Sequence, residues 1–207
     1  MRAVIRAYVL VVFVLMSGAA AQQEPQEPAK PATVTPPPKA APPLPAWVDE
    51  LVKKQFGPEF SVVADFYPAV VSADLDGDQV EDCVIVGRSK NPLLDQQNHG
   101  YKVLDPHNAY FGFGDVKVTW EFNMRDPERN RFLLVIHGSG ADAWRAATPK
   151  AKFVLVNIPF DRLGLTRIEY KKKTINALST EETTILTSVV FWTGKKYRWE
   201  PNRVPGE

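Results

Sequence analysis

Cysteine is almost absent from this chain of 207 residues, because Cys83 is the only one. A single cysteine excludes internal disulfides, so an exported form of this chain needs a core large enough to hold its fold unaided. Cys83 begins the apolar run 83–86 (CVIV). This setting favours an inert buried thiol over a nucleophile.

An excess of charge of either sign is also missing. Lysine and arginine total 25, aspartate and glutamate total 24, and the net charge is +1. It falls to −1 if Arg2 and Arg6 are removed with an N-terminal signal. Nucleic-acid-binding domains usually carry a clustered basic excess, so the balance gives no support for nucleic acid as a partner.

Catalytic motifs are scarce as well. The three histidines, His99, His107 and His137, stand at no metal-binding spacing. Residues 132–140 (FLLVIHGSG) resemble the strand and HG-x-G oxyanion turn of α/β-hydrolases, and the resemblance implies an acyl-transfer site at His137–Gly140. The nucleophile motif G-x-S-x-G, however, occurs nowhere in the chain. We therefore expect a non-catalytic protein and keep a secreted hydrolase as an alternative.

The first 21 residues, in contrast, have the pattern of a secretory signal peptide. Arg2 and Arg6 precede the apolar run 7–16, and small residues follow, with Ala19 and Ala21 as the A-x-A pair. We expect cleavage after Ala21 and a periplasmic or extracellular protein. An uncleaved anchor is the alternative, and only then is the membrane a partner. The apolar run alone is shorter than the roughly 17 residues that a spanning helix needs.

Residues 22–45 are dense in proline and contain almost no large apolar side chains. This composition predicts an extended linker, with a proline-rich docking ligand as the alternative. The length of residues 46–203 predicts a single domain, followed by a tail at 204–207. The strands expected below make this domain β-rich.

The domain begins with an amphipathic helix over 47–56, where Trp47, Val48, Leu51, Val52 and Phe56 recur at helical spacing before Gly57–Pro58 ends it. Most later segments have the composition and boundaries of strands. The expected strands are 69–73, 82–87, 116–122, 132–137, 152–158, 165–175, 184–192 and 196–199. The fold class is therefore expected to be α+β, mainly antiparallel β-sheet with an N-terminal amphipathic helix.

The last two expected strands allow a register to be predicted. A two-residue turn at Thr193–Gly194 would place Val190 opposite Tyr197 and Ser188 opposite Trp199. The face with Val190, Trp192, Tyr197 and Trp199 is then expected to face the core.

The strongest chemical signal is the aspartate-rich loop 74–82 (DLDGDQVED). Carboxylates occupy its first, third, fifth and ninth places, and five acidic residues occur among nine without a lysine or arginine. Alternate residues of a tight turn can converge on one ion, and hard oxygen ligands suit Ca²⁺. The expected ligands are the side chains of Asp74, Asp76, Asp78 and Asp82, with a backbone carbonyl near Val80. An acidic hairpin turn without metal is the alternative.

An EF-hand does not fit this loop, because its twelfth place is Ile85 instead of glutamate and its sixth is Gln79 instead of glycine. The loop resembles the strand–loop–strand calcium motif of FG-GAP and VCBS-type repeats, with the pattern D-x-[DN]-x-D-x-x-x-D before an apolar strand. The resemblance covers residues 70–87, occurs once, and implies Ca²⁺ as a structural cofactor. Gln79 replaces a common glycine, so we expect a strained backbone there.

These features together predict an exported binding or structural module of the cell envelope, with a protein or another envelope component as its partner. The segment 90–114 supports a third hypothesis, an adhesion or inhibitor domain. It is long and contains both turn residues and aromatic side chains, and long connections often carry function.

Overall fold

The computed structural model describes residues 43–113, 131–182 and 186–201. By its contacts the chain divides into units 1–39 and 40–207, and every described residue belongs to the second unit. The signal peptide, the linker up to residue 42, the strand expected at 116–122 and the tail therefore lie outside the described residues. Among the described helices, none is long and apolar enough to cross a membrane.

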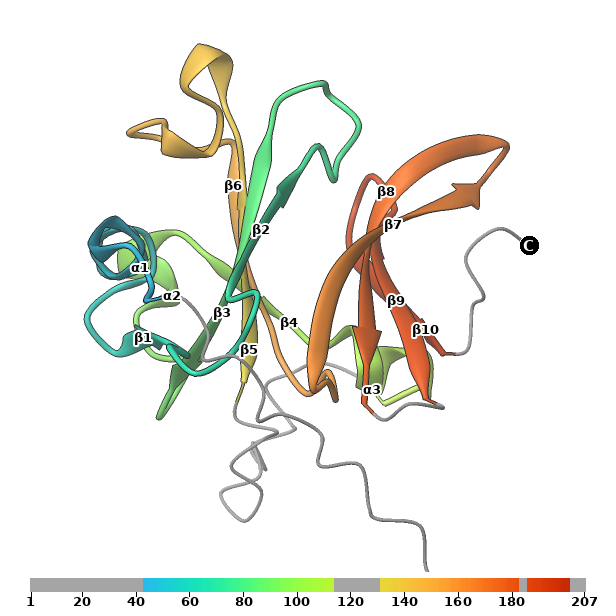
Figure 1. Ribbon diagram of the computed structural model, residues 1–207, viewed down its shortest axis with the longest axis horizontal. Coiled ribbons are helices and arrows are strands. Elements are labelled where there is room, and N and C mark those ends of the chain that lie inside the picture. The colour runs from blue at the N-terminus through green and yellow to red at the C-terminus, as the bar shows by residue number, and fades with distance from the viewer. Residues whose placement is uncertain (1–42, 114–130, 183–185, 202–207) are drawn as a thin grey trace, which may run out of the picture. The chain divides into compact units, whose positions relative to one another are not determined.

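The described residues are mostly β-sheet, arranged as a helix and two sheets in three layers (Figure 1). The first sheet has the order β1-β3-β5-β6-β4, with β2 also paired to β3. Its strands are β1 (Phe60–Val62), β2 (Val70–Ala73), β3 (Asp82–Ser89), β4 (Lys102–Leu104), β5 (Phe132–His137) and β6 (Ala151–Leu155). The second sheet is an antiparallel meander of β7 (Arg162–Tyr170), β8 (Lys173–Glu181), β9 (Thr187–Trp192) and β10 (Tyr197–Pro201).

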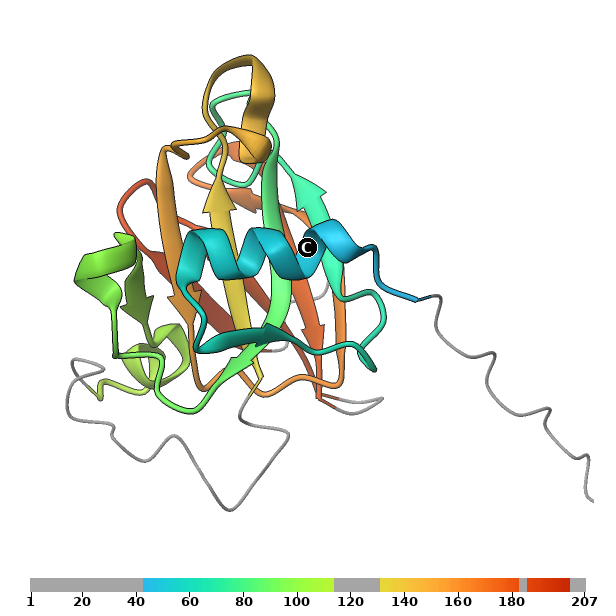
Figure 2. The ribbon, with the colours of Figure 1, turned by 90° about the vertical axis from the view of Figure 1, so that its left-hand side faces the viewer.

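Helix α1 (Ala46–Phe56) covers the outer face of the first sheet, as Figure 2 shows. It follows Pro45 and ends where Gly57 adopts a φ of 102° and donates its N–H to the Lys53 carbonyl. The amphipathic helix predicted from the sequence is therefore confirmed. Its buried side chains Val48, Val52 and Phe56 pack against the sheet, and each fully buried side chain of this size contributes about 1.5–3 kcal/mol.

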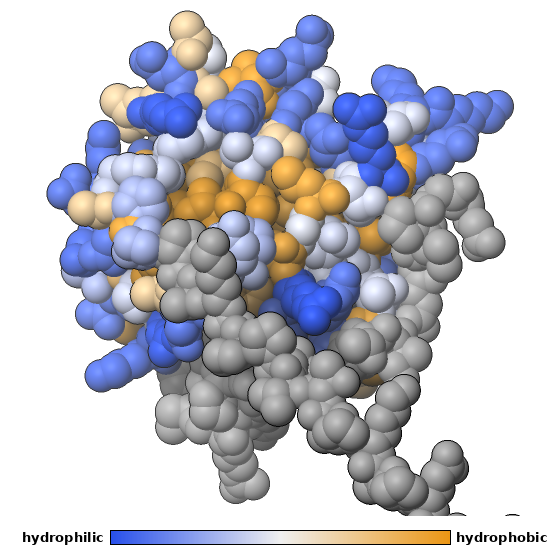
Figure 3. Space-filling view, in the orientation of Figure 1, coloured by the Kyte–Doolittle hydropathy of each residue, from blue (hydrophilic) through white to orange (hydrophobic). Residues whose placement is uncertain are grey.

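Strands β3 and β5 are buried on both faces, which explains why their sequences are continuous apolar runs. Val84 and Val86 lie in the core between the two sheets, whereas Cys83 and Ile85 pack in the core beneath α1. Burial raises the pKa of the Cys83 thiol to about 12, in agreement with the expected inert thiol. In the orientation of Figure 3, apolar side chains gather near the middle of the visible face, in the region of β2.

The prediction of a single strand at 165–175 is wrong. The chain turns at Lys171 and Lys172, which have φ values of 51° and 64°, and β7 and β8 pair with Tyr170 opposite Lys173. Positive φ at both central residues is typical of a two-residue hairpin turn, which usually contains glycine or asparagine. Because lysines occupy both positions, the sequence has no turn signal there.

The predicted register of the terminal hairpin is also wrong, by two residues. Tyr197 pairs with Trp192 and Trp199 with Val190, because the turn spans four residues instead of two. The Thr193 N–H and hydroxyl both donate to the Lys196 carbonyl and close this turn, at 3.0 and 2.8 Å. A shift of two residues keeps every side chain on the same face, so the expected aromatic cluster does face the core.

The segment 90–114 is partly folded. It contains α2 (Gln96–His99), β4 and α3 (Pro106–Tyr110), and β4 pairs in parallel with β6. This pair makes the first sheet mixed, so the prediction of a mainly antiparallel fold holds with one exception among the described strands.

Candidate metal site

The acidic loop connects β2 to β3, which pair antiparallel from Val70↔Ile85 to Ala73↔Asp82. It projects beyond the paired ends of these strands (Figure 1). Strands instead of helices flank the loop, so its setting differs from an EF-hand. Strand pairing fixes the two ends of the loop, which forces the residues between them into a tight turn.

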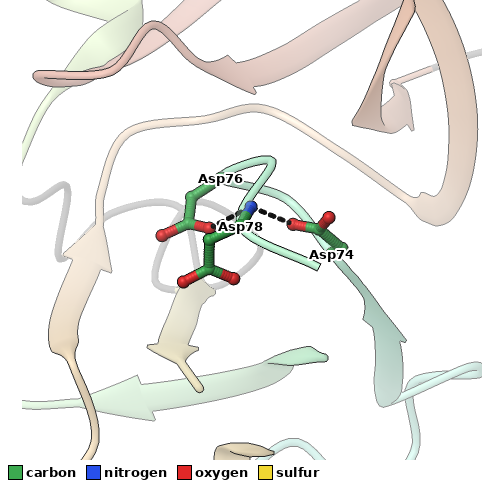
Figure 4. Close-up of side chains that lie close together, drawn as sticks. All are labelled: Asp74, Asp76 and Asp78. Atoms are coloured by element: carbon green, nitrogen blue, oxygen red, sulfur yellow. Dashed lines mark hydrogen bonds between the residues drawn. The ribbon is translucent and has the colours of Figure 1, made fainter. Parts of the chain in front are cut away.

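Three carboxylates converge in this turn. One oxygen from each of Asp74, Asp76 and Asp78 lies within 4.8 Å of the other two. Figure 4 shows the backbone N–H of Asp78 between the carboxylates of Asp74 and Asp76, at 3.2 Å from an oxygen of each. The Asp74 carboxylate also accepts the N–H groups of Gly77 and Gln79, at 2.7 and 2.9 Å. Gln79 has a φ of 69°, the strained conformation expected from the sequence.

A lysine from a distant part of the chain offsets part of the negative charge of this cluster. The Lys150 ammonium lies 2.7 Å from Asp76 Oδ2 and 2.6 Å from Asp78 Oδ2. The two hydrogen bonds raise the pKa of Lys150, and the hydrogen bond from Lys150 lowers the pKa of Asp78. The contact could not be predicted from the sequence, because Lys150 is 74 residues away from Asp76.

Asp82 does not join the cluster. Its side chain is buried, and its two oxygens accept the backbone N–H groups of Leu75 and Gly138, each at 2.8 Å. Burial is the main reason that the pKa of Asp82 rises to about 6. The carboxylate ties the start of the loop to the end of β5. Val80 donates its own N–H to Asp78 Oδ1, at 2.9 Å.

A buried histidine connects the cluster to the second sheet. His137 Nδ1 lies 3.3 Å from Asp76 Oδ2, and His137 Nε2 lies 2.7 Å from the Tyr197 hydroxyl. Burial lowers the pKa of His137 and raises that of Tyr197, so both are neutral near pH 7. The Tyr197 hydroxyl then donates to Nε2, and the histidine proton resides on Nδ1, facing Asp76. The rings of Phe153 and Trp192 pack against the imidazole.

The glycine turn after His137 is already hydrogen-bonded. The Gly138 N–H donates to Asp82, and the Ser139 N–H donates to the Ala143 carbonyl at 3.0 Å. An oxyanion hole needs free N–H groups aimed at the substrate. These two amides therefore support the fold of the loop instead of facing a ligand.

The other two histidines lie apart from this cluster. His99 ends α2, where its ring approaches the backbone at Gly57. His107 lies in α3 and packs against Trp199, with ring centroids 4.7 Å apart. Both therefore have packing contacts.

The cluster offers carboxylate oxygens in a partly exposed turn, which is the chemistry of a hard divalent cation such as Ca²⁺. The residues that the sequence predicted and the structure brings together are Asp74, Asp76 and Asp78. Comparison with known proteins finds no matching family model, no matching curated protein and no matching solved structure.

Proposed function

We propose that this protein is an exported, non-catalytic binding or structural module of the cell envelope, with a Ca²⁺-stabilised loop at Asp74–Asp82. The observation that carries the proposal is the convergence of Asp74, Asp76 and Asp78 within 4.8 Å. The resemblance of the loop to the calcium motif of FG-GAP and VCBS-type repeats supports the choice of ion. The signal-peptide pattern at 1–21 supports export.

The three aspartates supply part of the six to eight oxygen ligands that Ca²⁺ takes. A backbone carbonyl near Val80 and water molecules complete the shell. Asp82 supports the loop from behind, because its two oxygens already accept the N–H groups of Leu75 and Gly138. Asp82 thus has a supporting role in place of the ligand role expected from the sequence.

Lys150 offsets part of the negative charge of the loop without a metal ion. The side chain of Lys150 is 49% exposed, whereas that of Asp76 is 3% exposed. The ammonium can therefore swing into water when Ca²⁺ approaches, while the carboxylates stay in place. The lysine competes with the metal and keeps the metal-free loop folded.

The hydrogen bonds at the glycine turn support a non-catalytic role over the hydrolase alternative. The N–H groups of Gly138 and Ser139 already donate hydrogen bonds to the Asp82 carboxylate and the Ala143 carbonyl. His137 is 1% exposed and holds contacts at both ring nitrogens, so it is placed to brace the loop instead of receiving a substrate proton.

Metal content and thermal stability test the calcium proposal. Protein purified without chelator is expected to contain about one Ca²⁺ per chain by mass spectrometry. With Ca²⁺ at 100 times its Kd, the melting temperature should exceed that in EGTA by about 5–10 °C. Asp78→Asn should lose the bound ion and most of the shift, and Asp142→Asn, an exposed aspartate outside the loop, should keep both. Protein that contains no calcium and whose melting temperature EGTA leaves unchanged would contradict the calcium proposal.

The adhesion alternative has one observation in its favour. Tyr110, Phe111 and Phe113 are 48%, 55% and 64% exposed within one short stretch of the segment 90–114. Adjacent exposed aromatic residues are typical of protein-binding surfaces. Pull-down of defined envelope proteins should weaken in a Tyr110→Ser, Phe111→Ser variant. Equal capture by both forms would count against this surface.

A further inference from the structure

A hollow of about 420 Å³ lies on the outer side of the first sheet, between α1 and the short helix η2 (Gly140–Arg145). Figure 2 shows the two elements on this side of the molecule, with the η2 loop above α1. Its volume is within the usual range for small-molecule sites. It is lined by Trp47, Glu50, Leu51, Lys54, Trp144 and Arg145. It is separate from the acidic cluster, which none of these residues joins.

Two stacked tryptophans form the apolar part of the hollow. The Trp47 and Trp144 ring centroids lie 5.2 Å apart with an angle of 28° between the ring planes. Trp47 is 42% exposed, although it lies on the apolar side of the amphipathic helix, whereas Trp144 is 5% exposed. A large exposed aromatic surface is costly in water, and tryptophan is enriched at binding sites.

The position of Trp144 is fixed by several contacts. Its Nε1–H donates to Glu81 Oε2 at 2.8 Å, and the Arg145 guanidinium lies 3.8 Å from its ring centroid. Ala143, the residue before it, has φ 52° and ψ −132°, a conformation that alanine rarely adopts. Backbone strain of this kind costs about 1–3 kcal/mol and is concentrated at functional sites. The contacts hold the inner ring of the stack in one orientation and offset the cost of the strained backbone beside it.

The charges around the rings are of both signs. Glu50 contributes an acceptor, and Lys54 and Arg145 contribute donors. Lys54 forms no ion pair with any residue in the described ranges. The Arg145 guanidinium lies 3.8 Å from the Glu81 carboxylate, so its charge is already paired. The remaining charges, Glu50 and Lys54, are equal and opposite and favour neither an anionic nor a cationic ligand. A neutral ring with many hydroxyl groups fits, because each hydroxyl both donates and accepts.

We propose that this hollow binds a neutral carbohydrate, with one sugar ring stacked on the exposed face of Trp47. Glu50 accepts hydrogen bonds from its hydroxyls, and Lys54 and Arg145 donate to its oxygens. The apolar C–H face of the sugar covers the ring that is otherwise exposed to water. The hollow uses none of the proposed metal ligands, and it is linked to the acidic loop by the hydrogen bond from Trp144 to Glu81.

Titration of the full chain with neutral hexasaccharides tests the inference through tryptophan fluorescence. Cellohexaose, hexa-N-acetylchitohexaose and maltohexaose are the probes, and at least one is expected to change the emission saturably. Trp47→Ala should weaken binding at least tenfold, as expected for a central aromatic contact. Tyr67→Ala, which removes a 67% exposed aromatic side chain outside the hollow, should leave binding unchanged. Circular dichroism melts confirm that each variant is folded.

A matched lysine pair gives a second test that does not remove a tryptophan. Lys54→Ala removes a donor of the hollow and should weaken binding roughly two- to tenfold. Lys53→Ala changes the neighbouring helical residue, which pairs with Asp49 and does not line the hollow, so its affinity should equal that of the wild type. The inference is overturned if no probe binds at millimolar concentration, if folded Trp47→Ala binds normally, or if both lysine variants behave alike. Binding only of an acidic probe such as hexagalacturonate, abolished by salt, would overturn the neutral class.

Discussion

At the scale of single residues, the acidic loop is organised by partners from elsewhere in the chain. Spacing alone predicted that Asp74, Asp76 and Asp78 would meet, because alternate residues of a tight turn face the same point. The partners Lys150 and His137 come from later segments, and no local pattern links them to the loop. The spacing of the loop therefore predicted that the three aspartates converge, but not that Lys150 pairs with two of them.

Replacing Lys150 tests this competition. Lys150→Gln leaves Asp76 and Asp78 without a cation, so the metal-free protein should lose about 1 kcal/mol of stability, a modest value because the ammonium is half exposed. Calcium should bind about tenfold more tightly, equivalent to about 1.4 kcal/mol, since no side chain must leave. Urea unfolding in EGTA and calcium calorimetry measure the two effects.

Lys195→Gln is the control, because Lys195 is an exposed lysine in the β9–β10 turn, away from the loop. It should change neither quantity. Weaker calcium binding by Lys150→Gln would show that the lysine supports the metal instead of competing with it.

Asp82 is expected to be important for stability. Asp82→Asn keeps the size of the side chain but replaces one acceptor oxygen with an NH₂ group, which cannot accept the N–H of both Leu75 and Gly138. One buried N–H is left without a partner, so the free energy of unfolding should fall by about 1–3 kcal/mol in urea denaturation. Asp142→Asn, at an exposed position, should leave the free energy of unfolding unchanged. An unchanged Asp82→Asn midpoint would contradict the proposed tie between the loop and β5.

At the scale of elements, composition predicted the strands better than their connections. The expected strand at 132–137 agrees fully with β5, and the expected strand at 82–87 lies within β3. The errors occur at turns. Lys171 and Lys172 adopt positive φ without glycine, and the four-residue turn after Trp192 moved the terminal register by two. Short elements such as β4 were missed because their pairing with β6 depends on distant contacts.

The close contact between the end of β5 and the acidic loop gives a prediction at this scale. A Cβ atom at Gly138 would lie 2.3 Å from the Glu81 carbonyl oxygen and 2.8 Å from Val80 Cγ1. Gly138→Ala must push the loop away from β5, so we expect a loss of more than about 2 kcal/mol in unfolding free energy and weaker calcium binding.

Gly140→Ala is the matched control for this change. It adds the same methyl group two residues away, where nothing lies within 4 Å, and costs only the strain of a φ of 62°, about 1–2 kcal/mol. If Gly140→Ala were the more damaging change, the account of this contact would be wrong.

At the scale of the whole molecule, the arrangement of layers explains how the fold is stable without disulfides. The first sheet is covered by α1 on one face and by the second sheet on the other, so β3 and β5 are buried on both sides. The acidic loop and the tryptophan hollow are each anchored in one of these cores, through Leu75 and Trp144 respectively. The packed cores therefore hold both proposed sites in place.

The export hypothesis makes a prediction for the complete chain. Expressed with its own N-terminus in a bacterial host, the protein should appear outside the cytoplasm with Gln22 as its first residue, because the peptidase recognises Ala19 and Ala21. N-terminal sequencing of the fractionated protein measures this. An Ala19→Leu, Ala21→Leu variant should retain Met1–Ala21, and a wild-type protein that also retains this segment would favour the membrane-anchor alternative.

Calorimetric titration of Ca²⁺ into protein freed of metal with EGTA tests the central claim most directly. The account predicts one site per chain with a Kd between about 10⁻⁷ and 10⁻³ M, the range of calcium sensors and extracellular modules. It predicts at least tenfold weaker binding in Asp78→Asn and unchanged binding in Asp142→Asn. Wild-type protein that shows no binding up to millimolar Ca²⁺, or binding that Asp78→Asn leaves intact, would contradict it.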